Sequence, residues 1–209
     1  MERCKYLMGA HAQFHEMRRF STWKQAKLIT YETITTHDDT GSWAMKEFYL
    51  ISGTMGVGKT TTCLELKKRM HNCVFLDGDW CWDMNPFRVT EETKHMVIEN
   101  ICFLLNNFIK CSAYANIIFC WVMHEQSIID DILSRLTTVD CRIHSISLVC
   151  SMQALETRLR KDLKSGIRTE DVIQRSIERI PLYDKLDTYK LDVSEMSAEQ
   201  AACFIINNF

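Results

Sequence analysis

The chain has 209 residues, of which 46% are hydrophobic, and its 25 basic and 27 acidic side chains leave a net charge of −2. These values predict one domain of ordinary size with a substantial core, and the mixed charges argue against nucleic acid as a partner. The longest apolar run, residues 117–123, is too short to span a bilayer, so no membrane partner is expected. The ten cysteines are scattered without metal-binding spacing, which predicts reduced thiols in a cytoplasmic protein.

Residues 1–44 differ from the rest of the chain. They show little sustained periodicity and end in a turn-rich stretch at 36–42. Met45 follows shortly afterwards, directly before the first apolar strand, and would be a natural first residue for a domain. We therefore predict an N-terminal extension over residues 1–44, which is either loosely ordered or the product of a misassigned start, and a separate domain over residues 45–209.

The strongest motif is Gly53–Thr60, which matches the pattern G-x-x-x-x-G-K-[ST] without a mismatch. An apolar strand at 48–51 precedes it and a helix at 61–70 follows, which is the context in which this loop binds phosphate through its backbone N–H groups and the helix N-terminus. Lys59 is expected on the β- and γ-phosphates and Thr60 on Mg²⁺. The sequence thus predicts binding of ATP with Mg²⁺ by Gly53, Thr54, Met55, Gly56, Val57, Gly58, Lys59, Thr60 and Thr61.

Strands and helices alternate along the rest of the chain. Strands are predicted at 73–76, 116–123, 143–149 and 189–193. Helices are predicted at 90–108, 126–136 and 151–163. Two further helices are predicted to begin near residue 169 and at a capping box over 197–200. A break at 164–168 separates two of the helices. This order predicts an α/β fold: a three-layer α/β/α sandwich around a five-stranded parallel sheet.

The second strand ends in Asp77-Gly78-Asp79. Ligands of open α/β sheets bind beyond the carboxyl ends of the strands, and a carboxylate there can accept a hydroxyl proton or hold Mg²⁺ through water. We predict Asp79 as the base or hydroxyl-orienting residue and Asp77 as its metal-side partner. The alternative is a D-G-D turn that serves only its own geometry.

Residues 80–87 are unusually aromatic for a loop. Apolar walls with a few polar anchors suit a small-molecule pocket, so Trp80 and Trp82 are candidates for contact with substrate; the alternative is that they fill a gap in the core. His124 follows the third strand at the same edge of the sheet and is a candidate for contact with substrate or γ-phosphate, although a surface histidine is the commoner explanation.

Residues 46–209 resemble the nucleoside monophosphate kinase and small-molecule kinase branch of phosphate-loop (P-loop) proteins, which includes adenylate, shikimate, gluconate and adenylylsulfate kinases and antibiotic phosphotransferases. The segment 75–79 is similar to the L-D-G-D segment of adenylylsulfate kinases, although Trp80 replaces the polar residue found there. The segment 154–159 resembles a stretch of nucleoside monophosphate kinases whose arginine stacks on adenine, which implies this role for Arg158. The resemblance also implies a short lid, in which Arg168 would reach the transferred phosphoryl group with Arg160, Lys161 and Arg175.

The resemblance implies that residues 45–209 form a P-loop kinase domain that moves the γ-phosphoryl group of ATP to a small hydroxyl- or phosphate-bearing acceptor, such as a nucleoside or nucleotide. Its catalytic residues would be Lys59, Asp77, Asp79 and Arg168. Two alternatives stay open. One is a nucleotide-binding or NTPase switch that acts on a protein partner, and the absence of an aspartate at the end of the third strand favours it slightly. The other is a phosphotransferase that inactivates an antibiotic or modifies a sugar precursor.

Overall fold

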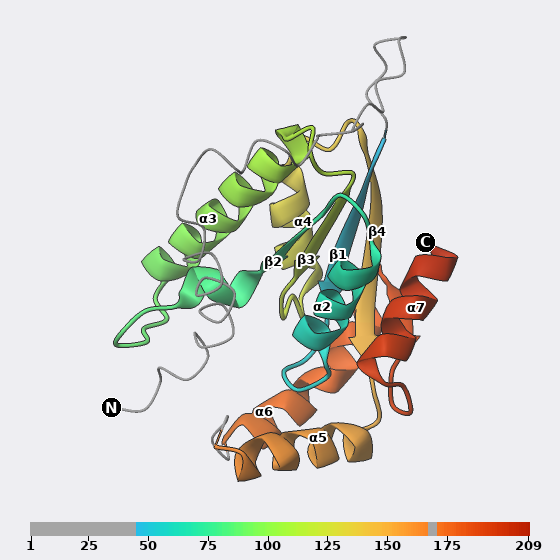
Figure 1. Cartoon of the computed structure of the whole chain (residues 1–209). Coiled ribbons are helices and arrows are strands. Elements are labelled where there is room, and N and C mark those ends of the chain that lie inside the picture. Colours follow the sequence, from blue (N-terminus) through green and yellow to red (C-terminus); the bar gives the residue numbers. More distant parts are fainter. Residues whose placement is uncertain (1–44, 167–170) are drawn as a thin grey trace, which may run out of the picture. The chain divides into compact units, whose positions relative to one another are not determined.

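A computed structural model describes residues 45–166 and 171–209 of the chain. The predictions for residues 1–44 and for Arg168 lie outside these described residues. Five parallel strands form one sheet in the order β2-β3-β1-β4-β5 (Figure 1). The strands are β1 (Lys46–Ser52), β2 (Cys73–Asp77), β3 (Asn116–Cys120), β4 (Cys141–Val149) and β5 (Tyr189–Asp192). The predicted five-stranded parallel sheet is therefore confirmed.

Helices cover both faces of this sheet, as predicted for a three-layer α/β/α sandwich. They are α2 (Lys59–Arg69), α3 (Glu91–Lys110), α4 (Gln126–Ser134), α5 (Met152–Lys164), α6 (Asp171–Arg179) and α7 (Ala198–Asn208), with short 3₁₀ helices η3 (Gly78–Trp82) and η4 (Ile180–Lys185). In Figure 1, α3 and α4 lie on one side of the sheet, and α2 and α7 lie on the other. None of the helices in the described part of the chain is long and apolar enough to cross a membrane.

The central strand β1 shows why both faces need cover. Phe48 and Leu50 pack into one buried cluster with α3 and α4, while Tyr49 and Ile51 pack into a second cluster with α2, α5 and α7. Successive side chains of a strand point to opposite faces, so a strand that is apolar at every position must be buried on both. Of the nine cysteines in the described residues, all are free thiols; four are buried, four are half-buried and one is exposed.

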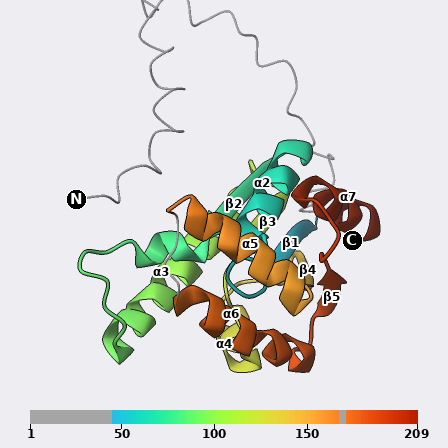
Figure 2. The ribbon, with the colours of Figure 1, turned by 90° about the horizontal axis from the view of Figure 1, so that it is seen from below.

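The carboxyl ends of the strands form the edge at which the candidate site lies. β1 pairs with β3 on one side and with β4 on the other. The strands that follow β1 in the chain, β2 and β3, lie on one side of it, and the later strands β4 and β5 lie on the other side. Open α/β sheets bind ligands at such a switch point in strand order. Helices α5 and α6 lie across this end of the sheet (Figures 1 and 2).

Two local predictions differ from the structure. The third strand was expected to run to Met123, but it ends at Cys120, and the backbone N–H of Trp121 makes a last 3.1 Å hydrogen bond to the carbonyl of Ile51. β1 itself ends at Ser52, so beyond that bond β3 has no further residue of β1 with which to pair. Residues 78–82 form the 3₁₀ helix η3 instead of a loop, because the Asp77 carboxylate caps it by accepting the N–H of Asp79.

Candidate active site

The loop between β1 and α2 has a backbone that only glycine adopts readily. Gly53, Gly56 and Gly58 have φ values of +150°, +81° and +109°. A Cβ on Gly53 would stand 2.8 Å from the carbonyl oxygen of Leu148, and one on Gly56 would collide with the side chain of Leu159 on α5. In the described part of the chain, no side chain caps the N-terminus of α2. The loop and this helix end therefore present backbone N–H groups in the manner of an anion site.

Two side chains at the end of the loop, those of Lys59 and Thr60, have defined partners. The Lys59 ammonium donates to the carbonyl oxygen of Thr54 at 3.1 Å and so lies back over the loop. The Thr60 hydroxyl donates to the buried carboxylate of Asp77 at 2.6 Å. The structure thus brings together the two residues predicted to serve Mg²⁺. A hydroxyl and a carboxylate oxygen beside an anion-binding loop fit the oxygen donors that Mg²⁺ prefers.

Asp79, the predicted base, is oriented by a tryptophan that the sequence analysis did not single out. The indole Nε1–H of Trp121 donates to the Asp79 carboxylate at 3.1 Å. A Cβ on Gly78 would lie 2.6 Å from the Trp121 ring, so glycine at this position lets the indole pack against the end of β2. In the sequence Trp121 lies inside the apolar run that was assigned to the third strand, so no signal there separated it from the core.

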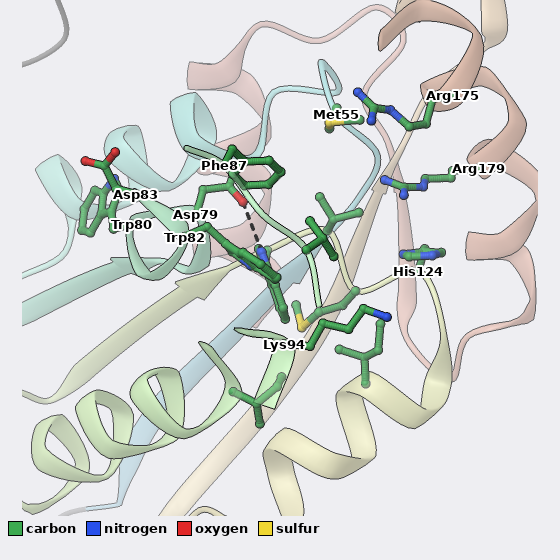
Figure 3. A pocket seen from close by; sticks show the side chains of 16 residues that line it. Met55, Asp79, Trp80, Trp82, Asp83, Phe87, Lys94, His124, Arg175 and Arg179 are labelled. Atoms are coloured by element: carbon green, nitrogen blue, oxygen red, sulfur yellow. Dashed lines mark hydrogen bonds between the residues drawn. The ribbon is translucent and has the colours of Figure 1, made fainter. Parts of the chain in front are cut away.

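A cavity of about 730 Å³ opens beside Asp79 (Figure 3). The phosphate loop contributes Met55 to its wall, and α6 contributes Arg175 and Arg179. Most of the remaining wall is aromatic or aliphatic, with a few charged and polar side chains: Trp80, Trp82, Asp83, Phe87, Val89, Lys94, Ile98, Trp121, Val122, Met123, His124 and Ile128. One cavity thus joins the phosphate loop, the predicted base and the helix that follows the predicted lid.

Two of the predicted substrate residues, Trp82 and His124, lie on the inner wall of this cavity. The ring of Trp82 lies beside that of Trp121, with 6.5 Å between centroids and 34° between ring planes. Trp80 is different: it is 57% exposed, packs edge-on against Phe75, and lies beside Asp83 in Figure 3, apart from Trp82 and His124. Trp80 therefore borders the cavity without pointing into it.

His124 carries a buried polar atom that nothing in the described residues satisfies. Its Nδ1 is buried without a hydrogen-bond partner there, and its Nε2 lies 3.6 Å from a carboxylate oxygen of Glu125, beyond hydrogen-bond distance. Burial lowers the pKa of His124 below its ordinary value, and the positive charge of Arg179 lowers it further. The imidazole is therefore mostly neutral at pH 7, and the residue borders the cavity.

Helix α6 is tied to the phosphate loop. The buried Thr54 hydroxyl donates to the carbonyl oxygen of Ser176 at 2.9 Å, which fixes the helix that carries Arg175 and Arg179 against the loop. Arg175 is also paired with Asp171 at 3.0 Å. By contrast, Arg160 forms a pair with Glu156 along the exposed side of α5.

Arg158, the predicted adenine-stacking residue, is held by backbone carbonyls. Its guanidinium donates to Val57 in the phosphate loop at 3.0 Å, and to Val193 and Ser194 after β5. A second, polar cavity of about 370 Å³ lies beside it, lined by Ser151, Gln153, Ala154, Thr157, Ser194 and Glu195. The guanidinium therefore borders a cavity next to the phosphate loop, and contact with a nucleotide base stays a prediction.

The sequence matches a known protein family, and the fold is similar to that of several solved structures. Residues 50–179 match the model of the AAA domain family. No curated protein matches the sequence. The fold is similar to that of a tunicamycin resistance protein from Deinococcus radiodurans, with 18% sequence identity, a TM-score of 0.59, and coverage of 78% of this chain and 94% of that one.

Two further solved structures share the fold. A sugar kinase from a Janibacter species has 12% identity and a TM-score of 0.58, with coverage of 78% of this chain and 93% of that one. A gluconokinase from Sinorhizobium meliloti has 14% identity and a TM-score of 0.55, with coverage of 78% and 95%. At these identities the similarity establishes a P-loop α/β fold shared with small-molecule kinases.

Proposed function

This chain belongs to the AAA domain family, and from that premise we propose that it is an ATP- and Mg²⁺-dependent kinase. It would transfer the γ-phosphoryl group to a small hydroxyl- or phosphate-bearing acceptor, such as a nucleoside, a nucleotide or a related metabolite. The observation that carries the proposal is the single cavity that Met55 of the phosphate loop, Asp79 and the α6 arginines line together. An acceptor in that cavity lies next to the place where the loop would hold the triphosphate.

The donor half consists of the loop and its immediate partners. Backbone N–H groups of residues 53–61 and the Lys59 ammonium would bind the β- and γ-phosphates. Thr60 and Asp77, which share a 2.6 Å hydrogen bond, would hold Mg²⁺. The bound metal supplies positive charge to the phosphate oxygens. Arg158 fixes the loop against the segment after β5 through its carbonyl contacts and would lie beside the base.

The transfer step needs positioning and charge neutralisation. The acceptor hydroxyl oxygen attacks the γ-phosphorus and forms a new O–P bond, while the bond from that phosphorus to the β,γ-bridging oxygen breaks and ADP leaves with the electron pair. The hydroxyl proton passes to the Asp79 carboxylate, which the Trp121 indole holds at 3.1 Å. Arg175 and Arg179 would neutralise charge on the transferred group, and Arg168 is proposed to join them.

A phosphotransferase that inactivates an antibiotic is the second candidate. The observation in its favour is the similarity of the fold to the tunicamycin resistance protein, combined with the largely apolar wall of the cavity. Both candidates share the chemistry at Lys59 and Asp79 and differ only in the acceptor.

The test is ADP release from ATP in the presence of nucleosides, nucleotides, sugars and antibiotics. We expect at least one acceptor to raise ADP release above the basal rate. Asp79→Asn should lower kcat by about 10²- to 10⁴-fold with nearly unchanged ATP affinity, because it removes only the proton acceptor. Asp140→Asn, an exposed change before β4 at the opposite end of the sheet, is the matched control. If no acceptor raises ADP release, the kinase proposal fails and a switch acting on a protein partner becomes the better account.

A further inference from the structure

The wall of the larger cavity is built from aromatic rings that the protein itself covers only in part. Trp82 and Trp121 lie side by side, and Phe87 lies against Trp82 with 5.8 Å between ring centroids. Phe87 is 58% exposed and Val89 is 54% exposed, although both are large apolar side chains. Apolar side chains that gather in one place and stay exposed mark a binding surface.

The size and composition of the cavity limit the acceptors that suit it. Its volume of about 730 Å³ falls in the range of roughly 300–1,000 Å³ that drug-sized ligands occupy. A small polyol or sugar acid would cover little of the aromatic wall and would place its hydroxyl groups against indole and phenyl faces. A planar ring would stack on those faces with the offset or edge-on geometry that aromatic pairs prefer.

The polar groups of the cavity stand at opposite sides of this wall. Figure 3 shows Asp79 and Trp82 on one side, and His124 and Arg179 on the other. Asp79 would take a hydroxyl group, as the proposed transfer requires. The imidazole of His124 and the guanidinium of Arg179, two residues that line the cavity, suit the polar edge of a heterocycle. An acceptor with a planar ring in the middle and a hydroxyl group at one end satisfies both sides together.

We propose that the acceptor is nucleoside-like: a planar heterocycle, stacked on Trp82 and Trp121, is joined to a sugar whose hydroxyl group faces Asp79. This inference rests on the proposed kinase function and narrows its acceptor class. It also separates this chain from the sugar kinase and the gluconokinase with which it shares its fold, because those names denote acceptors without a planar ring.

The first experiment compares acceptors in the ADP-release assay with the full chain. Uridine and adenosine carry the ring, while ribose and gluconate lack it. We expect kcat/KM for the better nucleoside to exceed that for ribose and gluconate by about 10- to 100-fold, the range that base–aromatic stacking supplies. Ribose or gluconate used as efficiently as both nucleosides would overturn the inference while leaving the kinase proposal intact.

Substitutions in the wall test whether the ring is the group recognised. Trp82→Leu should raise KM for the nucleoside about tenfold or more with KM for ATP unchanged, and Trp82→Phe should restore most of the loss. Phe103→Leu, which removes a 69% exposed aromatic ring from α3 outside the cavity, is the matched control. Equal losses for the nucleoside and for ATP in Trp82→Leu would indicate a structural role only and would contradict the inference.

A binding measurement separates failure of the inference from failure of the kinase proposal. If no acceptor raises ADP release, saturation-transfer NMR with uridine and ribose still reports contact with the protein. We expect saturation transfer from the wild-type protein to the uracil protons, its loss in Trp82→Leu and its retention in Phe103→Leu. That result would support a site for the ring even if the protein does not catalyse transfer. Absence of transfer from the wild-type protein to both uridine and adenosine would refute it.

Discussion

The donor and acceptor halves of the site are built in different ways. The donor half is a contiguous loop in which two side chains and one carbonyl already have partners: Thr60 bonds to Asp77, Thr54 to Ser176, and the carbonyl of Val57 to Arg158. The acceptor half is a set of side chains from separate segments. It includes a buried nitrogen of His124 that has no hydrogen-bond partner among the described residues, and the largely exposed ring of Phe87. The first half is fixed before any ligand binds, whereas the second leaves surface for a ligand to complete.

This contrast follows from what each half would recognise. A triphosphate presents the same oxygens in every nucleotide, so a rigid backbone loop suits it. An acceptor must be distinguished from other hydroxyl compounds, which requires side-chain surfaces of a particular shape and polarity. Substitutions in the donor half should therefore change catalysis or ATP binding for every acceptor. Those in the aromatic wall of the acceptor half should change only which acceptor is used, whereas the proposed base Asp79 acts on every acceptor.

Among substitutions in the donor half, the largest effect is expected for Lys59→Met. Loss of the ammonium removes positive charge from the phosphates, and kcat should fall by about 10²- to 10³-fold for every acceptor. ADP-release kinetics measure this, with thermal unfolding to confirm the fold. Lys67→Met, an exposed change on the same helix, is the control. If the fold decrease in kcat caused by Lys59→Met differed from one acceptor to another, the division between the donor and acceptor halves would be wrong.

Asp77→Asn should weaken the response to Mg²⁺. The amide oxygen can still accept from the N–H of Asp79, and the amide NH2 that replaces the second oxygen can donate to the Thr60 hydroxyl, which reverses that bond but keeps η3 and the loop in contact. The lost negative charge should raise the Mg²⁺ concentration for half-maximal activity by about 10- to 100-fold. Titration of activity with Mg²⁺ at saturating ATP measures the shift, with Asp140→Asn as the control. An unchanged Mg²⁺ requirement would remove Asp77 from the proposed metal site.

Arg158→Ala should lower the free energy of unfolding by about 2 kcal/mol and also weaken ATP binding. The substitution leaves the carbonyls of Val57, Val193 and Ser194 without their charged donor. Arg160→Ala removes an exposed i,i+4 pair on the same helix and should cost less than about 0.5 kcal/mol. Urea unfolding and equilibrium ATP binding measure both variants. Equal losses of stability would show that the carbonyl contacts of Arg158 contribute little.

The same contrast explains how much could be predicted from the sequence. The fold followed from apolar strands that alternate with helices, and the loop from eight contiguous residues whose spacing is fixed by the backbone. Thr60 and Asp77 could be paired in advance because the carboxyl ends of parallel strands meet at one edge. Both inferences use local patterns or a general rule of topology.

The acceptor half could be predicted only in part. Asp79, Trp82 and His124 were identified because each directly follows a predicted strand or stands in an aromatic segment. Trp121 was assigned to a strand, since an apolar run does not reveal where a sheet ends and a cavity wall begins. Arg158 was identified from the resemblance of segment 154–159 to nucleoside monophosphate kinases, but its three carbonyl partners depend on the packing of α5 against the segment after β5.

The smallest effect is expected from the protonation of His124. Burial, and then Arg179, lowers the pKa of this imidazole below the ordinary value of 6.5, while Glu125 opposes that shift. Above pH 6.5 the group is neutral in both the folded and the unfolded chain, so it does not change stability. As the pH falls below 6.5, the unfolded chain binds a proton before the folded chain does, and the wild-type protein loses stability until the pH passes the lowered pKa.

His124→Asn should remove this loss. The free energy of unfolding of the variant minus that of the wild type should rise as the pH falls from 7.5 to 5.5. Urea unfolding of both proteins at both pH values measures this difference. His95→Asn, on the exposed surface of α3, is the control and should not reproduce the gain. If a nucleoside contacts His124 and binds its neutral form, it should hold the imidazole neutral to lower pH in the folded protein, so the acid-induced loss of stability in the wild type should become larger and extend to lower pH. The same nucleoside should leave the pH dependence of the His124 variant unchanged. A nucleoside that changes the pH dependence of both proteins equally would show that His124 does not contact the acceptor.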